Sequence, residues 1–241
     1  MTQLYTKRSH LPVRITRVEP NDMLEFAEGQ LTAFGTRMYA ELEPIETRAP
    51  PEVRYRRFAY RHSRLLSLPS ERPMIARVTE PDGRERIAGC AWWHVPGAAI
   101  DNQQKRRVER MSEESDEEAE SWMNFDWRKW TEMLEKYDKI RKEKMGDEPH
   151  WYVGPVWTHP DYQGQGIATA LLEETIALAD ATAPPTPMYL EASPAGQPVY
   201  SKMGWVRIDG TETAMLRRGS PRNEGDSVTF ELMLPAFRKS D

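Results

Sequence analysis

The sequence predicts a mixed α/β fold, a sheet flanked by helices, and three observations support this class. Residues 74–95 hold two strand-like apolar runs on either side of Pro81-Asp82-Gly83, a tight-turn sequence, which is the pattern of a β-hairpin. Residues 150–158 form another strand-like run, which leads through a glycine-rich turn into an apolar segment with helical spacing. Apolar residues at helical spacing also recur between residues 20 and 43. We expect a single domain over residues 1–241.

The composition is that of a folded protein with a strongly charged surface. Hydrophobic residues make up 39% of the 241 residues, charged residues 29%, and the formal net charge is −5. A protein that binds nucleic acid normally presents a basic face, so this balance argues against such a partner. The sequence has no apolar run of membrane-spanning length and no apolar signal core near its start. We therefore expect a cytoplasmic protein that binds neither nucleic acid nor a membrane.

The single cysteine, Cys90, limits the chemistry that sulfur can provide. One cysteine cannot form an internal disulfide or a multi-cysteine zinc site. Cys90 lies in the apolar stretch IAGCAWW, and cysteine in such a setting is usually a buried thiol. We expect Cys90 to be a core residue.

The N-terminal third is expected to supply a strand and several helices. Residues 13–19, VRITRVE, alternate apolar and polar side chains as a half-buried strand does. The next segment has apolar residues at helical spacing, and an interruption near Gly29 or Gly35 is expected to leave one or two short helices. Part of residues 53–68 is expected to be helical before the hairpin begins.

Residues 101–148 differ in character from the rest and are expected to form a helical insertion. They include an acidic run, EESDEEAE, and such runs are usually solvated. Beyond it, apolar residues recur every three or four positions, which predicts an amphipathic helix. These residues are Met123, Trp127, Trp130, Leu134 and Tyr137. The stripe is expected to pack on the core, and a lid over a substrate pocket is the alternative.

The strand at 150–158, HWYVGPVWT, has Gly154-Pro155 in its middle. Proline cannot donate a backbone hydrogen bond, so a central strand excludes it unless the pairing is broken there. A β-bulge resolves the conflict, and bulges are common next to ligand sites. We therefore predict a bulge at Gly154-Pro155.

The C-terminal part is expected to alternate short strands and helices. After the glycine-rich turn, a helix runs to about residue 181, and residues 188–193 form a strand. Pro198 is tolerable only in the first turn of a helix, so the next helix is short, and Gly204 suits its C-terminal cap. Two strands are then expected, GWVRI at 204–208 and VTFELMLP at 228–235, with a polar loop at 209–226 between them.

Gly164 and Gly166 directly precede the apolar helix, and this arrangement predicts an anion site. Glycine allows unusual backbone angles and close approach, while the first helical turn offers unpaired N–H groups and the positive end of the helix dipole. The segment lacks the Gly-Lys-Ser/Thr ending of a P-loop. It also lacks the third glycine or alanine and the later acidic residue of a dinucleotide-binding fingerprint. Another class of phosphate ligand is therefore expected.

Two motifs resemble the GNAT superfamily of N-acetyltransferases. The signature Arg/Gln-x-x-Gly-x-Gly/Ala of that family is similar to Gln163-Gly164-Gln165-Gly166-Ile167-Ala168. Its later LYxKxGF element is similar to residues 199–205, VYSKMGW, about 35 residues further on. The stretch GPVWTHPDYQGQG also resembles fungal acetyltransferases of unassigned substrate. The resemblance covers residues 150–206 and is weaker over 13–95.

The resemblance implies a mixed, mostly antiparallel sheet that splays between its fourth and fifth strands, with acetyl-CoA in the gap. The family's bulge corresponds to Gly154-Pro155, and unpaired backbone beyond it would bind the pantetheine arm. Backbone amides of the glycine-rich turn would hold the pyrophosphate without a metal. The implied cofactor-binding residues are Val156, Trp157, Thr158, Gln163, Gly164, Gln165, Gly166, Ala168 and Thr169, with Ser193 where many members have an asparagine.

The same resemblance implies the catalytic groups. Tyr200 occupies the position of the family's general acid, and a phenol can protonate a departing thiolate. The backbone amide of Val156 or Trp157 is expected to polarise the thioester carbonyl. No acidic residue lies within residues 151–158, so Glu191 and His94 are the candidates for the general base. A structural ion pair for Glu191, a structural histidine at position 94 and a water chain in place of a base are the alternatives.

The expected activity is direct transfer of an acetyl group, in a ternary complex, from acetyl-CoA to a primary amine of a small molecule or peptide. The tryptophans, Trp92, Trp93, Trp127 and Trp130 among them, would suit an aromatic amine if they line the pocket, although core positions are expected for most. A sensor that binds acyl-CoA without turnover, and an enzyme with another acyl donor, are the alternatives. Both a monomer and a homodimer fit the sequence.

Overall fold

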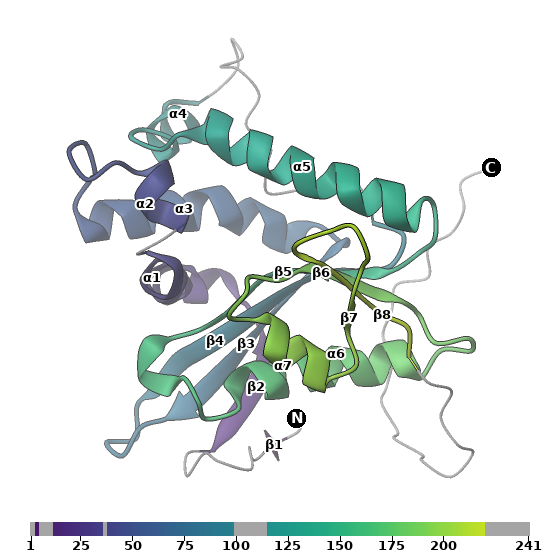
Figure 1. Cartoon of the computed structure of the whole chain (residues 1–241). Coiled ribbons are helices and arrows are strands. Elements are labelled where there is room, and N and C mark those ends of the chain that lie inside the picture. The colour runs from purple at the N-terminus through teal and green to yellow at the C-terminus, as the bar shows by residue number, and fades with distance from the viewer. Residues whose placement is uncertain (1–2, 5–11, 36–37, 99–114, 220–241) are drawn as a thin grey trace.

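The structure of the chain is a computed structural model, which describes residues 3–4, 12–35, 38–98 and 115–219 (Figure 1). Its centre is an eight-stranded sheet in the order β1-β2-β3-β4-β5-β6-β8-β7. The strands are β1 (Gln3–Leu4), β2 (Val13–Arg17), β3 (Glu71–Thr79), β4 (Glu85–His94), β5 (Trp151–Thr158), β6 (Met188–Glu191), β7 (Val206–Arg207) and β8 (Ala214–Arg217). Neighbouring strands are antiparallel except β5 and β6, which are parallel. The predicted mixed, mostly antiparallel sheet is confirmed.

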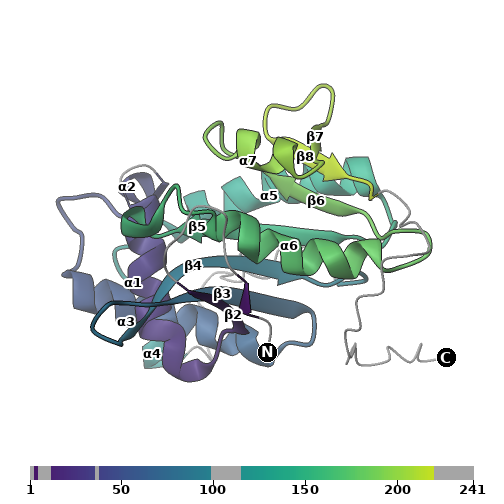
Figure 2. The ribbon, with the colours of Figure 1, turned by 90° about the horizontal axis from the view of Figure 1, so that it is seen from below.

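Helices cover both faces of this sheet (Figures 1 and 2). The helices are α1 (Met23–Phe34), α2 (Met38–Leu42), α3 (Pro51–Ser63), α4 (Asp116–Ser121), α5 (Trp127–Met145), α6 (Ile167–Asp180) and α7 (Gln197–Lys202). One core layer joins α6 and α7 to the side chains on one face of the strands. A second layer, on the opposite face, joins α1, α3 and the first half of α5 to residues such as Ile75 and Trp92. The two layers follow from the alternation of side chains along β3 and β4, because successive residues point to opposite faces.

The N-terminal half follows the sequence predictions closely. The hairpin of β3 and β4 turns at Gly83, whose φ of +85° suits glycine, and Cys90 is buried at 0% exposure. The interruption of the first helix falls at Gly35, and α1 continues through Gly29. A Cβ on Gly29 would lie 2.4 Å from the ring of Trp157, so the absence of a side chain lets α1 lie directly on β5.

The predicted loop at 209–226 is wrong over part of its length, because residues Ala214–Arg217 form β8. This strand pairs with β6, and its first two residues are buried in the core. Arg217 fixes it in place through two hydrogen bonds to Asp180 of α6, at 2.7 and 2.6 Å. Polar residues on both sides of Ala-Met-Leu hide this strand in the sequence. The strand predicted at 228–235 lies outside the described residues.

The predicted helix in the 101–148 segment is present but longer than its apolar stripe. The helix α5 begins after Asp126, which caps it by accepting from the N–H of Lys129 at 3.0 Å, and ends at Met145. Trp130 and Leu134 pack on the core as predicted, whereas Met123 precedes the helix and is 55% exposed. The buried stripe of α5 then continues as Asp138, Arg141 and Met145. Because two of these buried residues are charged, the apolar pattern does not predict the second half of α5.

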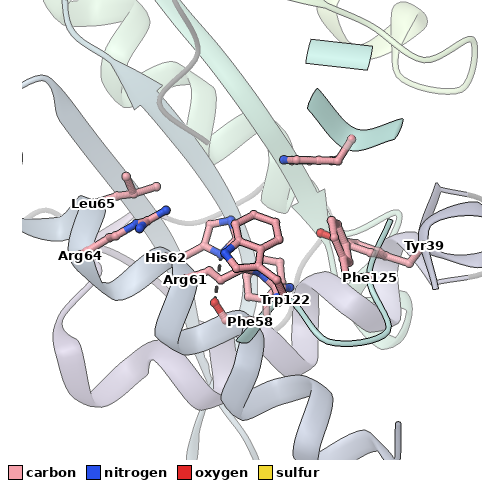
Figure 3. A pocket seen from close by; sticks show the side chains of 9 residues that line it. Tyr39, Phe58, Arg61, His62, Arg64, Leu65, Trp122 and Phe125 are labelled. Atoms are coloured by element: carbon pink, nitrogen blue, oxygen red, sulfur yellow. Dashed lines mark hydrogen bonds between the residues drawn. The ribbon is translucent and has the colours of Figure 1, made fainter. Parts of the chain in front are cut away.

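A small aromatic cavity between α3 and the start of the α4–α5 segment is filled by a cation of the chain itself (Figure 3). The guanidinium carbon of Arg61 lies 4.8 Å from the ring centroids of both Trp122 and Phe125, and Arg61 also donates to the carbonyl of Ser121. The cavity holds about 10 Å³, room for a single water at most. We infer that these contacts of Arg61 hold α4 against α3.

Within the described ranges, no helix combines the length and the apolar character needed to cross a bilayer. The cytoplasmic location stays a prediction.

Candidate active site

The predicted bulge lies in the middle of β5. Opposite it on β4, Trp93 pairs with Val153 and Ala91 pairs with Val156, so Gly154 and Pro155 together face one residue of β4. Pairing between β5 and β6 ends at the same point, since the last pair is Val153 with Leu190. The sheet therefore opens between β5 and β6 directly beyond the bulge, as the splayed sheet requires.

Beyond the bulge, the backbone groups of β5 on the side away from β4 point into this opening. The N–H of His159 donates to the carbonyl of Ala88 on β4 at 2.9 Å. Because successive residues of a strand direct their backbone groups to opposite neighbours, Trp157 also faces β4, whereas Val156 and Thr158 face the opening. Of the two amides considered for the thioester carbonyl, the geometry thus favours Val156.

The glycine-rich turn, which we call the phosphate loop (residues 163–169), follows the C-terminal end of β5. Gly164 and Gly166 have φ of +75° and +83°, in the region that favours glycine, and a Cβ on Gly164 would meet nothing within 4 Å. Gly166 caps α6 without a side chain, so the first N–H groups of α6 have no partner within the helix. The side chain of Gln163 does not cap these N–H groups, since it donates to the carbonyl of Thr158 at 3.2 Å. The N–H of Gln163 donates to the carbonyl of Pro160 at 3.3 Å, so the amides from Gly164 to Thr169 are those that can bind an anion.

Glu191 is the last residue of β6 and lies beside the bulge. Its Oε2 accepts a hydrogen bond from the hydroxyl of Tyr152 at 2.9 Å, while its Oε1 is buried without a hydrogen-bond partner. The Tyr152 hydroxyl lies 3.5 Å from the position that a Cβ on Gly154 would occupy, which places the pair at the bulge. Burial raises the pKa of Glu191 to about 7, although the Tyr152 hydrogen bond and the charge of Arg141 lower it. A carboxyl with this pKa exchanges protons near neutral pH.

His94, the other candidate base, is held by a structural pair. Its Nδ1 lies 3.0 Å from Oε1 of Glu71, a fully buried carboxylate that also accepts from the indole of Trp92 at 2.7 Å. The ring of His94 stacks on Tyr152 with a centroid distance of 5.1 Å and an interplanar angle of 22°. These contacts are those of a structural histidine that supports Tyr152.

Tyr200 lies on α7, the short helix that follows β6. Its ring packs edge-on against Trp205, with centroids 5.9 Å apart, and sits close above Gly196. Burial raises the pKa of its hydroxyl, so the phenol stays protonated at neutral pH and can act only as a proton donor. Ser193, in the turn before α7, is exposed, and its hydroxyl accepts from the N–H of Gly196 at 3.3 Å.

Three residues that the sequence analysis did not single out lie at this site. Tyr152 connects the bulge to Glu191, and the guanidinium carbon of Arg141 lies 3.9 Å from the centroid of its ring. Arg141 in turn pairs with Asp138 one helical turn earlier, with Nη2 and Oδ1 3.1 Å apart. The available signals were a tyrosine two residues before a predicted bulge and an Asp-x-x-Arg spacing on a predicted helix.

A pocket of about 270 Å³ adjoins the site at the N-terminal end of β5. The ends of β4 and α5 and the start of β5 form it, with His94, Arg141 and Tyr152 in its wall. The phosphate loop follows the opposite end of the same strand, so the bulge lies between pocket and loop. Trp92 and Trp93 do not line this pocket, because both are fully buried in the core.

Residues 139–216 match the family model for the acetyltransferase (GNAT) domain. This part of the chain is therefore similar to a GNAT acetyltransferase domain. The matched residues include the bulge, the phosphate loop, Glu191 and Tyr200. The GNAT fold of the sheet, with its opening between β5 and β6, agrees with this assignment.

Solved structures with a similar fold cover most of the chain. Arylalkylamine N-acetyltransferase 2 from Aedes aegypti superposes with a TM-score of 0.50 at 14% identity, covering 86% of this chain and 98% of that one. An uncharacterised protein from Bacillus halodurans superposes with a TM-score of 0.52 at 10% identity, covering 90% of this chain and 89% of that one. A structure described as histone acetyltransferase HPA2 and related acetyltransferase, from Corynebacterium glutamicum, has a TM-score of 0.49 at 20% identity. The match covers 87% of this chain and 98% of that one. No curated protein matched the chain.

Proposed function

We propose that this GNAT-domain protein is an acetyl-CoA-dependent N-acetyltransferase that transfers the acetyl group directly to a primary amine of a small molecule or peptide. The observation that carries the proposal is the position of Glu191. A carboxyl with a pKa of about 7 lies beside the bulge of β5, at the mouth of an opening whose far end is a phosphate loop. A base of that pKa suits proton removal at neutral pH.

The cofactor would lie in the opening between β5 and β6. The residues present fit its phosphates, since the N–H groups of Gly164 to Thr169 lie in a glycine-rich turn at the start of α6. The backbone of Val156 and the N–H of Thr158 would pair with the amides of the pantetheine arm, in the manner of an added strand, since the carbonyl of Thr158 already accepts from Gln163. The stretch of β5 from Gly154 to Thr158 spans about 13 Å at the usual rise of a strand.

The chemical step follows from the groups around the bulge. The neutral amine attacks the carbonyl carbon of the thioester, and the N–H of Val156 stabilises the oxygen as it gains charge. A C–N bond forms, the proton of the amine passes to Glu191, and the C–S bond breaks. Tyr200 gives its proton to the departing sulfur.

Direct transfer fits better than a thioester on the enzyme. Cys90 is the only cysteine of the chain, and it lies fully buried on the face of the sheet covered by α1. Burial also raises the pKa of its thiol, which keeps it protonated. This supports direct attack of the amine on the acetyl group over a thioester formed on Cys90.

The pocket at the N-terminal end of β5 is the proposed place of the acceptor amine. It lies towards the end of β5 opposite the phosphate loop, and it shares Tyr152 with the Glu191 pair. The two substrates would thus approach the bulge from opposite ends of one strand, which is the arrangement that a ternary complex needs.

The test is a thiol-release assay with acetyl-CoA across small amines, polyamines, amino acids and peptides with free N-termini. Turnover of one amine class in the parent protein, with loss of about 100-fold or more in Glu191→Gln, is the expected result. If the protein binds acetyl-CoA and acetylates no member of the panel, the non-catalytic acyl-CoA sensor becomes the better interpretation. Propionyl- and butyryl-CoA in the same assay test the preference for the acyl donor.

A further inference from the structure

We propose that α5 supplies two positioning residues to the active site: Arg141 and Asp138 hold Tyr152 at the bulge and set the charge state of Glu191. This inference rests on the proposed role of Glu191 as the base. The α4–α5 segment would then be part of the reaction machinery, rather than a lid or a structural cover alone.

The contact between Arg141 and Tyr152 is close and buried. The guanidinium carbon lies 3.9 Å from the ring centroid of Tyr152, and Arg141 is only 2% exposed. A cation over an aromatic ring is attracted to its face, most strongly where both are shielded from water. Together with the stacked His94 ring, this contact fixes the direction in which the Tyr152 hydroxyl points, and that hydroxyl is the donor to Glu191.

Asp138 balances the buried charge of Arg141. It is 6% exposed, and its Oδ1 lies 3.1 Å from Nη2 of Arg141. Because the two residues are three positions apart on one helix, the helix itself fixes the geometry of the pair. The pair moves with α5, so α5 determines where the cation lies over β5.

Packing alone does not explain this ion pair. The other buried residues of the α5 stripe are apolar, namely Trp130, Leu134 and Met145. Two apolar side chains at positions 138 and 141 would cover the sheet as well, because a buried ion pair gains little over a hydrophobic pair of similar volume. Among the buried residues of α5, the two charged ones lie beside Tyr152 and Glu191.

The charged and titratable groups that face Glu191 come from three elements. They are Tyr152 on β5, Tyr189 on β6, and Tyr137, Asp138 and Arg141 on α5. Burial is the largest influence and raises the pKa of Glu191, the charge of Arg141 lowers it, and the charge of Asp138 raises it. The tyrosines are neutral near pH 7, so the α5 pair provides the charges that act on the carboxyl.

The two members of the pair therefore have opposite effects. Arg141→Met removes the charge that favours the carboxylate, so the pKa of Glu191 should rise by about one unit. Asp138→Asn removes the charge that disfavours the carboxylate and leaves Arg141 in place, so the pKa should fall by a similar amount. Since Glu191 acts as a base only when deprotonated, the acidic limb of kcat/KM should move to higher pH in Arg141→Met and to lower pH in Asp138→Asn.

The direct measurement is a pH titration of the Glu191 carboxyl by ¹³C NMR, in the full chain labelled at glutamate side-chain carboxyls. Glu191→Gln identifies the resonance by its loss. Arg141→Lys keeps the cation and should leave the titration near that of the parent. Lys139→Met, which removes an exposed cation from the same helix, is the matched control and should shift nothing.

Opposite shifts in Arg141→Met and Asp138→Asn support the proposal. An unchanged titration in both, or shifts of both in the same direction, would overturn it and leave the pair a structural element of α5. If Arg141→Met does not fold, Arg141→Lys and Asp138→Asn decide between the same outcomes. Because the titration needs no turnover, a protein that acetylates nothing yet shows the opposite shifts would refute the proposed function and retain only the control of the Glu191 charge by the α5 pair.

Discussion

In the proposed mechanism, Tyr200 supplies the proton to the departing thiolate. Its hydroxyl can be removed without disturbing the ring, which packs on Trp205. In Tyr200→Phe, kcat should fall by about 100- to 10,000-fold, the usual effect of a positioned acid. The Kd of acetyl-CoA should stay within a few-fold, because the phosphate loop and the backbone of β5 provide most contacts. Thiol release and calorimetry measure the two quantities.

The matched control for this variant is Tyr60→Phe, which removes the same hydroxyl from an exposed position on α3. It should leave both quantities unchanged. Near-normal turnover in Tyr200→Phe would reduce Tyr200 to a packing residue and assign the proton to water.

Glu191 should also leave a signature in stability, because its folded-state pKa of about 7 lies above the ordinary value of 4.5. Below the ordinary value, both states are protonated and the shift contributes nothing. As pH rises towards 7 the unfolded state loses its proton first, so the folded state becomes less stable and the loss is complete above 7. Glu191→Gln should therefore be more stable than the parent at pH 8, by roughly 3 kcal/mol, and equal to it near pH 4.

Urea unfolding of the parent and the variant at both pH values tests this expectation. Glu173→Gln, at an exposed position on α6, removes the same charge outside the site and should show no such difference. A Glu191→Gln protein that is less stable at pH 8 would mean that the carboxylate is well solvated or paired in the folded state.

Among the elements, the phosphate loop is the most sensitive to a change of backbone. Valine at position 166 would meet a φ of +83° and would present a branched side chain where the pyrophosphate is expected. In Gly166→Val the Kd of CoA should rise at least about 100-fold, while the protein remains folded. Gly210→Val is the control, because Gly210 has a φ of +78° in a turn with open space around it. Equal affinity for CoA in parent and Gly166→Val, measured by calorimetry, would place the phosphates elsewhere.

The elements also show which features the sequence could predict. The hairpin, the β5 bulge and the phosphate loop were predicted because local chemistry decides them: a Pro-Asp-Gly turn, a proline inside a strand, and glycines before a helix. The strand β8 was missed because its pairing with β6 outweighs the polar residues around it. Asp138 and Arg141 were missed because their burial depends on α5 crossing β5, a tertiary contact that periodicity does not contain.

At the scale of the whole molecule, binding of acetyl-CoA should stabilise the fold without help from a divalent metal. The loop is proposed to hold the phosphates with backbone amides, so EDTA should leave the affinity unchanged. At about 100 times its Kd, the ligand should add about 2.7 kcal/mol to the free energy of unfolding. Thermal unfolding with and without EDTA measures this, and a gain that disappears on chelation would contradict the expected mode of phosphate binding.

The arrangement of the two substrates along β5 gives the last prediction. The cofactor is expected beyond the bulge and the acceptor before it, so a change in the pocket should affect only the acceptor. Ala98 lines that pocket, and in Ala98→Trp the indole would occupy much of its roughly 270 Å³. We expect kcat/KM for the amine to fall by at least about tenfold, equivalent to about 1.4 kcal/mol, while the Kd of acetyl-CoA stays the same.

Ala98→Ser, which adds a single hydroxyl, should retain most of the activity and serves as the control. Gly166→Val should show the reverse pattern, with the loss in cofactor affinity. The pair of variants thus separates the two ends of the strand, because each is expected to damage one substrate and spare the other. If Ala98→Trp weakened acetyl-CoA and left the amine unaffected, the pocket would belong to the cofactor, and the acceptor would have to reach the bulge from another side of α5.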